Sequence, residues 1–202
     1  MGGAGQQTAV GPVGAASVRA EIRPARTGDA AALHALISAN VEPARLLPRS
    51  LDDLTRHAGR FLVGAHGDAI LACGELAPLS RTLAEVRSLV VSDGHRGAGL
   101  GSRLLEAIVE KGRAAGFPTL CAFAHDPRPF VRLGFSIVPH VWLPEKISTD
   151  CHGCVWFRRC QQYAVVLDLA RMADVGSPRR PGAIERHDDP LRRVIAVTSV
   201  PA

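Results

Sequence analysis

The feature that most constrains this chain is a glycine-rich turn between two apolar runs, within residues 86–115. The run VRSLVV predicts a strand, and apolar residues recur at helical spacing over residues 100–109. The turn SDGHRGAGLGS between them holds four glycines, which let a backbone turn tightly and approach a ligand with no Cβ in the way. Free N–H groups at a helix N-terminus favour an anion, phosphate above all. The segment therefore predicts a strand, a pyrophosphate-binding turn beside Arg96, and a helix.

The spacing of the glycines excludes two common phosphate-binding motifs. A dinucleotide-binding G-x-G-x-x-G fails because Ser102 stands at the third position after Gly99, and this segment contains no P-loop G-x-x-x-x-G-K-[ST]. The pattern that fits is R-x-x-G-x-G, formed by Arg96, Gly99 and Gly101 directly after a run ending LVV. This pattern resembles the acyl-CoA signature of the GNAT N-acetyltransferase superfamily. An ordinary glycine-rich turn is the alternative, and the arginine and the flanking elements argue against it.

The GNAT resemblance implies a fold and a cosubstrate. The fold would be α/β (α+β), a mixed central sheet with helices on both faces, and the cosubstrate would be acetyl-CoA. In that family the amides of the turn hold the CoA pyrophosphate, and the preceding strand exposes the thioester to backbone N–H groups. The cofactor-binding residues implied in this way are Leu89, Val90, Val91, Arg96, Gly97, Ala98, Gly99, Gly101 and Ser102.

Composition narrows the class of protein. With 202 residues the chain has room for one domain with a full core, and an aromatic content of 4% means that aliphatic residues must fill it. The net charge of +5 suits an anionic cofactor and an acidic substrate, and its spread along the chain does not indicate nucleic-acid binding. No run reaches transmembrane or signal-peptide length. Five cysteines, an odd number without secretory context, indicate reduced thiols and a cytoplasmic location.

The chain divides into three parts by composition. Residues 1–17 are rich in Gly, Ala and Gln and predict a flexible leader, and residues 172–202 are rich in Pro and mixed charge and predict a disordered tail. Residues 18–171 would form the acetyltransferase domain. Its expected elements are strand 18–25, a helix capped by Thr27 or Asp29 and ending at Ile37, a short helix from Ser50 to His57, a hairpin of 60–66 and 69–77 around Gly67 and Asp68, strands 85–92 and 119–124, a helix at 129–133, a strand from Ser136 and a last strand at 163–169.

Acetyl transfer to an amine needs a proton acceptor for the amine and a proton donor or stabiliser for the leaving thiolate. Glu85, at the entrance of the strand before the turn, could accept the amine proton directly or through water; the alternative is a solvated carboxylate at a strand end. Many GNAT enzymes carry a tyrosine acid in a later F-Y-x-x-x-G-F motif, where this chain has Val131. Another group such as His125, or water, would then protonate the thiolate, or the protein binds acyl-CoA without turnover.

Three segments narrow the resemblance. LLPRS at 46–50, EVRSLVV at 85–91 and WLPEKISTDCHGCVWFRRCQQYAVVLDL at 142–169 resemble the acetyltransferase domain of bacterial N-acetylglutamate synthases, here as a stand-alone form matched over roughly residues 18–169. In that family the arginine corresponding to Arg49 contacts the substrate carboxylate, a task suited to a guanidinium fork. Glutamate needs a second cation, for which Arg87, Lys146 and Arg158 or Arg159 are candidates, each with a solvated surface base as the alternative. The resulting substrate-binding residues are Arg49, Arg87, Ser88 and Lys146.

The cysteines form a second pattern. Cys151 and Cys154 have C-x-x-C spacing, Cys160 follows closely, and His152 or Cys121 could complete a zinc or iron-sulfur site. The sequence offers three clear ligands where a structural zinc site needs four. We therefore expect no metal, and interpret these cysteines as buried small hydrophobic thiols.

Three functions follow. The first is an enzyme that acetylates the α-amine of an amino acid, L-glutamate above all, in arginine biosynthesis. The second is a GNAT enzyme for another amine, and the third is a non-catalytic regulator that responds to acyl-CoA or a metal. The partner would be a small amino acid, with no nucleic acid and no membrane, and a homodimer is left open.

Overall fold

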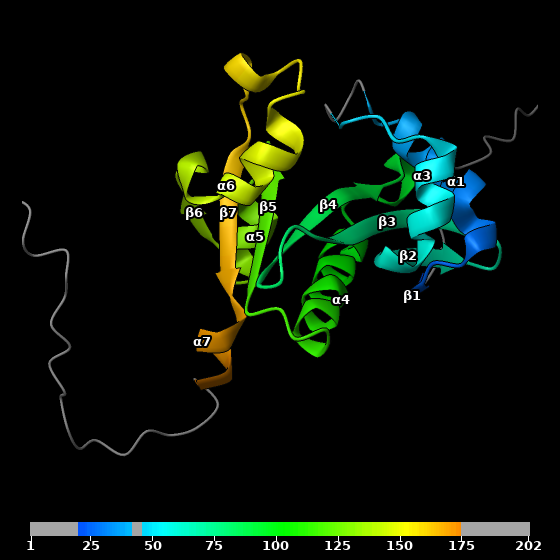
Figure 1. Ribbon diagram of the computed structural model, residues 1–202. Coiled ribbons are helices and arrows are strands. Elements are labelled where there is room, and N and C mark those ends of the chain that lie inside the picture. Colours follow the sequence, from blue (N-terminus) through cyan, green and yellow to red (C-terminus); the bar gives the residue numbers. More distant parts are fainter. Residues whose placement is uncertain (1–19, 42–45, 175–202) are drawn as a thin grey trace, which may run out of the picture.

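The computed structural model describes residues 20–41 and 46–174, and its centre is a seven-stranded sheet (Figure 1). The strand order is β1-β2-β3-β4-β5-β7-β6. The strands are β1 (Glu21–Pro24), β2 (Phe61–His66), β3 (Ala69–Pro78), β4 (Leu83–Val91), β5 (Thr119–Ala124), β6 (Ser136–Val138) and β7 (Tyr163–Asp168). The helices are α1 (Ala30–Ser38), α3 (Leu51–His57), α4 (Leu100–Ala114), α5 (Arg128–Arg132), α6 (Pro144–Lys146) and α7 (Leu169–Asp174), with a π-helical turn η5 (Ile147–Cys151) directly after α6.

The parallel pair β4 and β5 determines where a ligand can enter the sheet. Every other strand pair is antiparallel, and α4 connects β4 to β5. The pairing of β4 with β5 begins at Leu83 and ends at Val86, which faces Ala122, although β4 continues to Val91. Beyond Val86 the two strands separate, and the edge of β4 that faces β5 is left unpaired.

Helices cover both faces of the sheet, as the sequence predicts. On one face, α4 packs its apolar stripe of Leu104, Leu105 and Ile108 against β2, β3 and β4. On the other face, α1 and α3 bury Leu33, Ile37 and Leu54 in a second cluster with β2 and β3. The sheet thus separates an α4 face from an α1 face, and Figure 1 shows α4 and α1 on its two sides.

A β-bulge at Ser88 redirects the side chains of β4. The pairing of β3 with β4 shifts by one residue between Cys73 and Glu75, and Ser88 has a left-handed φ of 51°. Val86 and Leu89 both pack toward α4, although alternation would put them on opposite faces. The extra residue therefore leaves both Arg87 and Ser88 on the α1 face, where both line the cavity described below.

The structure confirms the expected mixed α/β fold and the order of its elements, with corrections at three ends. α1 begins directly after Asp29, one of the two predicted N-cap positions, but ends at Ser38, one residue beyond Ile37. β4 starts at Leu83, so Glu85 lies inside the strand instead of at its entrance. β7 ends at Asp168, and α7 continues through Asp174, three residues into the segment predicted to be a disordered tail. The leader and the rest of the tail lie outside the described residues.

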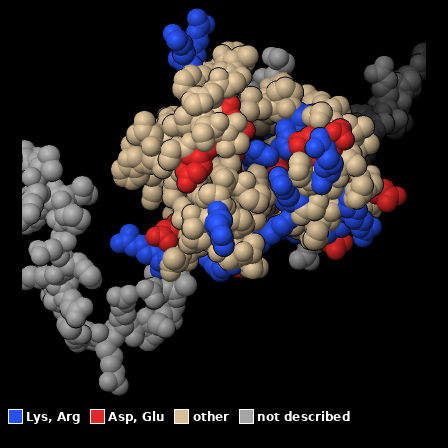
Figure 2. All heavy atoms as spheres, in the orientation of Figure 1, with Lys and Arg blue, Asp and Glu red and all other residues tan. Residues whose placement is uncertain are grey.

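The distribution of charge and the character of the helices bear on what the molecule can contact. Figure 2 shows Lys and Arg side chains gathered over the half of the molecule that holds α1, α3 and β1 to β3, with acidic side chains among them. Within residues 20–41 and 46–174, no helix has the length and apolar character to cross a membrane.

Candidate functional site

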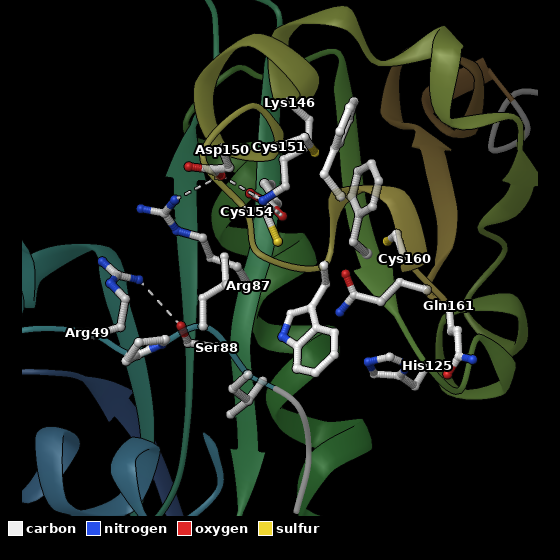
Figure 3. Close-up of a pocket in the computed structure, with 18 of the residues that line it drawn as sticks. Arg49, Arg87, Ser88, His125, Lys146, Asp150, Cys151, Cys154, Cys160 and Gln161 are labelled. Carbon is white, nitrogen blue, oxygen red and sulfur yellow. Dashed lines mark hydrogen bonds and ion pairs between the residues drawn. The ribbon is translucent and has the colours of Figure 1, made fainter. Parts of the chain in front are cut away.

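A cavity of about 400 Å³ opens on the α1 face, where β4 and β5 separate. Its walls come from the loop before α3, from β4 and β5, and from the segment between α6 and β7. All four predicted substrate-binding residues line it, and so does the predicted catalytic Glu85. In Figure 3, Arg49 and Ser88 lie on one side of the cavity, with Cys160, Gln161 and His125 on the opposite side. The charged, polar, aromatic and thiol side chains of its walls include Arg49, Asp53, Glu85, Arg87, Ser88, Phe123, His125, Lys146, Asp150, Cys151, Cys154, Trp156, Phe157, Arg159 and Cys160.

Two arginines of the cavity share one buried carboxylate. Glu75 of β3 has a fully buried side chain, and its Oε2 accepts hydrogen bonds from Arg49 Nη1 at 2.6 Å and Arg87 Nε at 2.9 Å. Burial alone would raise the pKa of Glu75, but the hydrogen bonds from Arg87 and Arg49 outweigh it and hold this pKa below its usual value. Arg49 is also held by Asp53, since its Nε donates to Asp53 Oδ2 at 2.8 Å. The two guanidinium groups are thus fixed side by side at one end of the cavity.

A second ion-pair cluster includes Glu85. Lys146 Nζ lies 2.7 Å from Glu85 Oε1 and 2.7 Å from Asp150 Oδ2. The Glu85 side chain is 2% exposed, so the interpretation of a solvated carboxylate at a strand end is wrong. Burial raises the pKa of Glu85 against the opposing effect of the Lys146 ammonium group. Asp150 also lies 3.7 Å from Arg87 Nη1, so it connects this cluster to the arginine pair.

The alternative interpretation, that each candidate cation is a solvated base on the surface, is therefore wrong for three of them. Arg49, Arg87 and Lys146 are all partly or wholly buried and ion-paired in the cavity wall. Arg158 and Arg159 are exposed, and of these two only Arg159 lines the cavity.

The glycine-rich turn lies between β4 and α4 and does not line this cavity. Gly97 and Gly99 have left-handed φ values of 79° and 78°, and a Cβ at either position would meet no atom within 4 Å. Gly99 is the N-cap of α4, a helix of 15 residues, so its open surface faces the free N–H groups of the first helical turn. Arg96 donates from Nη2 to Asn40 Oδ1 at 2.7 Å and from Nε to the Val91 carbonyl at 3.0 Å. The turn therefore fits a pyrophosphate, with the guanidinium group of Arg96 held beside it.

The residues of β4 in the predicted cofactor set have different surroundings. Val90 is buried in the α1-face cluster, while Leu89 and Val91 pack against the α4-face cluster. Their side chains are therefore core residues, and only their backbone is available along the unpaired edge of β4.

The cysteine prediction needs correction. Cys73 and Cys121 are buried, but Cys151 and Cys154 are only partly buried and Cys160 is exposed, so these three are not core thiols. All three line the cavity. Within the described residues, no group of three or more His, Cys, Asp or Glu side chains is arranged to hold a metal ion.

The general acid has no single candidate. When the F-Y-x-x-x-G-F motif is aligned on Gly134 and Phe135, its tyrosine position falls on Phe130 and not on the expected Val131; Phe130 lies in α5 and is buried, and neither side chain carries a proton donor. Tyr163 begins β7 opposite Ala124, and it is absent from the residues that line the cavity. His125 does line the cavity, one residue beyond the end of β5.

Sequence reasoning missed Glu75, Asp53 and Asp150. Glu75 interrupts an apolar strand, and an acid inside a buried run is a signal of a buried partner. The position of Asp53, three residues after Ser50, indicates only a helix cap, and the Ser50 side chain does accept a hydrogen bond from the Asp53 backbone N–H at 3.1 Å. Asp150 had no signal, because its partners Lys146 and Arg87 come together only through the fold.

A glycine-rich turn that fits a pyrophosphate, and a charged cavity where the preceding strand leaves its parallel neighbour, are the features expected of an acyl-CoA-dependent transferase. A sequence profile of the Acetyltransferase (GNAT) family matches residues 29–135, just over half of the 202 residues. The chain belongs to this family, and it is an acetyl-CoA-dependent N-acetyltransferase of the GNAT type.

Two curated proteins are similar in sequence to this chain. An uncharacterised N-acetyltransferase of Chlorobaculum tepidum is 27% identical over 148 residues, which are 73% of this chain and 96% of that protein. The amino-acid acetyltransferase of Neisseria meningitidis serogroup A is 31% identical over 131 residues, 64% of this chain but only 30% of that longer protein.

Two solved structures have the same fold. N-acetylglutamate synthase of Neisseria gonorrhoeae, complexed with coenzyme A and N-acetyl-glutamate, matches with a TM-score of 0.65 and 28% identity over 74% of this chain and 35% of that chain. A Mycobacterium tuberculosis protein in complex with CoA matches with a TM-score of 0.63 and 22% identity over 74% of this chain and 99% of that chain, which shows the fold alone.

Proposed function

We propose that this protein transfers the acetyl group of acetyl-CoA to the α-amine of an amino acid, with L-glutamate as the leading acceptor. The observation that carries the proposal is the pair Arg49 and Arg87, held by the buried Glu75 so that both face one cavity. Guanidinium groups bind carboxylates in a bidentate manner, and a dicarboxylate acceptor needs at least two cations. The likeness to amino-acid acetyltransferases and to an N-acetylglutamate synthase supports this choice.

In the proposed reaction, acetyl-CoA is held by the glycine-rich turn and its thioester lies along the unpaired edge of β4. Backbone N–H groups of residues 88–91 stabilise the negative charge that develops on the thioester oxygen as the amine attacks. The acceptor carboxylates bind Arg49 and Arg87, with Ser88 Oγ beside them, 3.4 Å from Arg49 Nη1.

Glu85 is the proposed proton acceptor for the amine. Its raised pKa makes it a stronger base than a solvated carboxylate, but Lys146 occupies both carboxylate oxygens. The amine proton would therefore reach Glu85 through a water molecule. His125 at the cavity edge, or water, would protonate the CoA thiolate.

A second acceptor class is favoured by the other wall of the cavity. Phe123, Trp156 and Phe157 present aromatic side chains, and the cations already have partners: Arg49 with Asp53 and Glu75, and Lys146 with Glu85 and Asp150. An amine with one carboxylate and an apolar group would use this wall, whereas glutamate would not.

A thiol-release screen with acetyl-CoA and each protein amino acid tests the proposal. We expect release of free CoA with glutamate at a higher kcat/KM than with aspartate, glutamine, leucine or phenylalanine, and formation of N-acetylglutamate by mass spectrometry. Faster release with an apolar amino acid would move the acceptor to the second class. Acetyl-CoA binding without release for any amine would favour a regulator. Arginine biosynthesis and a cytoplasmic location are part of the proposal for glutamate.

A further inference from the structure

The segment between α6 and β7 concentrates thiols in the wall of the cavity. Cys151, Cys154 and Cys160 all line it, within ten residues of chain, and acetyl transfer as proposed uses none of them. Cys73 and Cys121 differ, because both are buried and burial raises the pKa of each to about 12. The three cavity thiols are therefore the cysteines that a reagent in the cavity can reach (Figure 3).

Two of these thiols belong to one tight turn. The backbone N–H of Cys154 donates to the Cys151 carbonyl at 3.0 Å, which closes a turn with His152 and Gly153 at its centre. Such a turn holds its first and last Cα atoms within about 7 Å. A disulfide requires Cα atoms about 4.4–6.8 Å apart. Cys151 and Cys154 thus have nearly the backbone spacing of a disulfide while both are free thiols.

From this turn we infer that Cys151 and Cys154 form a dithiol modification site in the wall of the acceptor cavity, which small-molecule disulfides oxidise to an intramolecular disulfide. The inference uses the acceptor cavity of the proposed function, but the chemistry of the two thiols does not depend on which amine that cavity binds.

The order of the two exchange steps follows from the surroundings of Cys151. Burial raises the pKa of Cys151, and the Asp150 carboxylate acts in the same direction, against the opposing effect of Lys146, so little of Cys151 is thiolate at neutral pH. Cys154 therefore reacts first: its thiolate attacks one sulfur of oxidised glutathione and expels one glutathione thiolate. Cys151, after loss of its proton, attacks the Cys154 sulfur of the mixed disulfide and expels the second. The protein dithiol loses two electrons and two protons, and one glutathione disulfide becomes two glutathione thiols.

The position of Cys151 couples this chemistry to acceptor binding. Cys151 is the last residue of η5 and directly follows Asp150, which holds Lys146 at 2.7 Å and lies 3.7 Å from Arg87. Drawing the Cys151 side chain to Cys154 moves the end of η5 and, with it, the Asp150 carboxylate. A shift of about 1 Å in such a positioning group can cost about a hundredfold in rate. The glycine-rich turn lies outside the cavity, so acetyl-CoA binding is not affected.

The test begins with the chemistry of the thiols. Full-length protein is incubated with oxidised and reduced glutathione at a series of ratios, alkylated, and digested with trypsin. Cleavage after Lys146 and Arg158 gives a peptide that holds Cys151 and Cys154 but not Cys160. We expect this peptide to lose two hydrogens and to escape alkylation, whereas in Cys154→Ser it retains an alkylated Cys151. A peptide that keeps two alkylated thiols, or a disulfide that joins Cys160 to either, would overturn the site.

The second readout is the acceptor. We expect oxidation to raise KM for the acceptor by about tenfold or more, with the affinity for acetyl-CoA unchanged by calorimetry and full recovery after dithiothreitol. After the same treatment with oxidised glutathione, Cys154→Ser should have the same KM for the acceptor as before the treatment. In Cys160→Ser, as in wild type, the treatment should raise this KM. Disulfide formation with unchanged acceptor kinetics would overturn the coupling. Reduced wild-type protein that acetylates no amine would refute the proposed function instead, and the peptide readout would still decide the thiol site.

Discussion

At the scale of single residues, Glu75 organises the end of the cavity that holds Arg49 and Arg87. Its buried carboxylate is the common partner of Arg49 and Arg87, which come from segments far apart in the chain. A buried carboxylate between two arginines fixes the orientation of both guanidinium groups, because no water competes for its hydrogen bonds. The cavity therefore offers two oriented guanidinium groups before any substrate binds. In the proposed function, the specificity for the acceptor depends on Glu75, although this residue does not itself line the cavity.

Glu75→Gln tests this dependence. The amide keeps the shape but removes the charge opposite two buried guanidinium groups, so we expect a loss of about 3 kcal/mol in the free energy of unfolding. KM for the acceptor should also rise, because both arginines lose their fixed position. Urea unfolding and steady-state kinetics measure the two effects.

Asp52→Asn is the matched control for Glu75→Gln. Asp52 pairs with Arg56 at 2.5 Å, but both side chains are exposed, at 75% and 64%. Screened pairs of this kind contribute little, so neither stability nor KM should change measurably. Equal effects of the two substitutions would contradict the role of Glu75.

Arg49→Ala tests whether Arg49 binds a carboxylate of the substrate. A desolvated, charge-assisted contact contributes about 2–4 kcal/mol, so Arg49→Ala should raise KM for glutamate at least about tenfold. KM for acetyl-CoA should stay nearly constant, since the glycine-rich turn is separate from the cavity.

Arg60→Ala provides the comparison for Arg49→Ala. Arg60 Nη1 lies 4.0 Å from the same Glu75 carboxylate, but Arg60 does not line the cavity. Its removal should leave both KM values near those of wild type. If both arginines affect glutamate and acetyl-CoA alike, Arg49 supports the fold and does not contact substrate.

At the scale of elements, β4 serves both halves of the site. Its pairing with β5 stops at Val86, and its bulge at Ser88 puts Arg87 and Ser88 on the cavity side. The strand then runs directly into the glycine-rich turn and α4. One continuous segment therefore connects the proposed acceptor cavity to the proposed pyrophosphate site.

Gly99→Ala tests the turn. A methyl group at Gly99 would occupy the open surface above the first turn of α4 and would also strain a φ of 78°, at a cost of about 1 kcal/mol. We expect the affinity for acetyl-CoA to fall at least about tenfold by calorimetry, since the backbone can no longer approach the pyrophosphate.

The opposite end of α4 offers a control with the same strain. Gly116 also has a φ of 78° and nothing within 4 Å of an added Cβ. Gly116→Ala should lower stability by a similar amount and leave acetyl-CoA binding intact. Equal loss of binding in the two variants would show that strain, and not the turn surface, is responsible.

At the scale of the whole molecule, the ion-paired carboxyl groups predict how stability varies with pH. The pKa values of Glu75, Asp53 and Asp29 lie below their usual range in the folded protein. A lowered carboxyl pKa contributes stability that is present above the unfolded value and is lost as pH falls through the folded value. Glu85 has a raised pKa and acts in the opposite direction.

Because carboxyl groups with a lowered pKa outnumber the one with a raised pKa, we expect the unfolding temperature to fall between about pH 5 and pH 3. Calorimetry across this range measures it. Glu75→Gln removes one titrating group, so the difference between wild type and this variant should shrink as the pH falls. A constant difference would mean that Glu75 does not titrate in this range.

Local patterns determined much of the fold. Ser50 as a helix cap, Gly67 at the hairpin and the spacing of Gly97 and Gly99 act over a few residues, so the elements and the glycine-rich turn could be predicted from neighbours in the chain. The ends of β4 and β7 could not, because strand ends depend on the pairing partner, which the chain order does not specify.

The sequence by itself determined the GNAT turn, the mixed sheet and the identity of the candidate cations, since these depend on residue type and short-range spacing. Only the tertiary structure decided that Arg49 and Arg87 share Glu75, that Lys146 neutralises Glu85, and that Cys151 and Cys154 line the cavity. The physical reason is that charge pairing and burial are set by distances between segments. Those distances depend on how the sheet packs and on a one-residue bulge at Ser88.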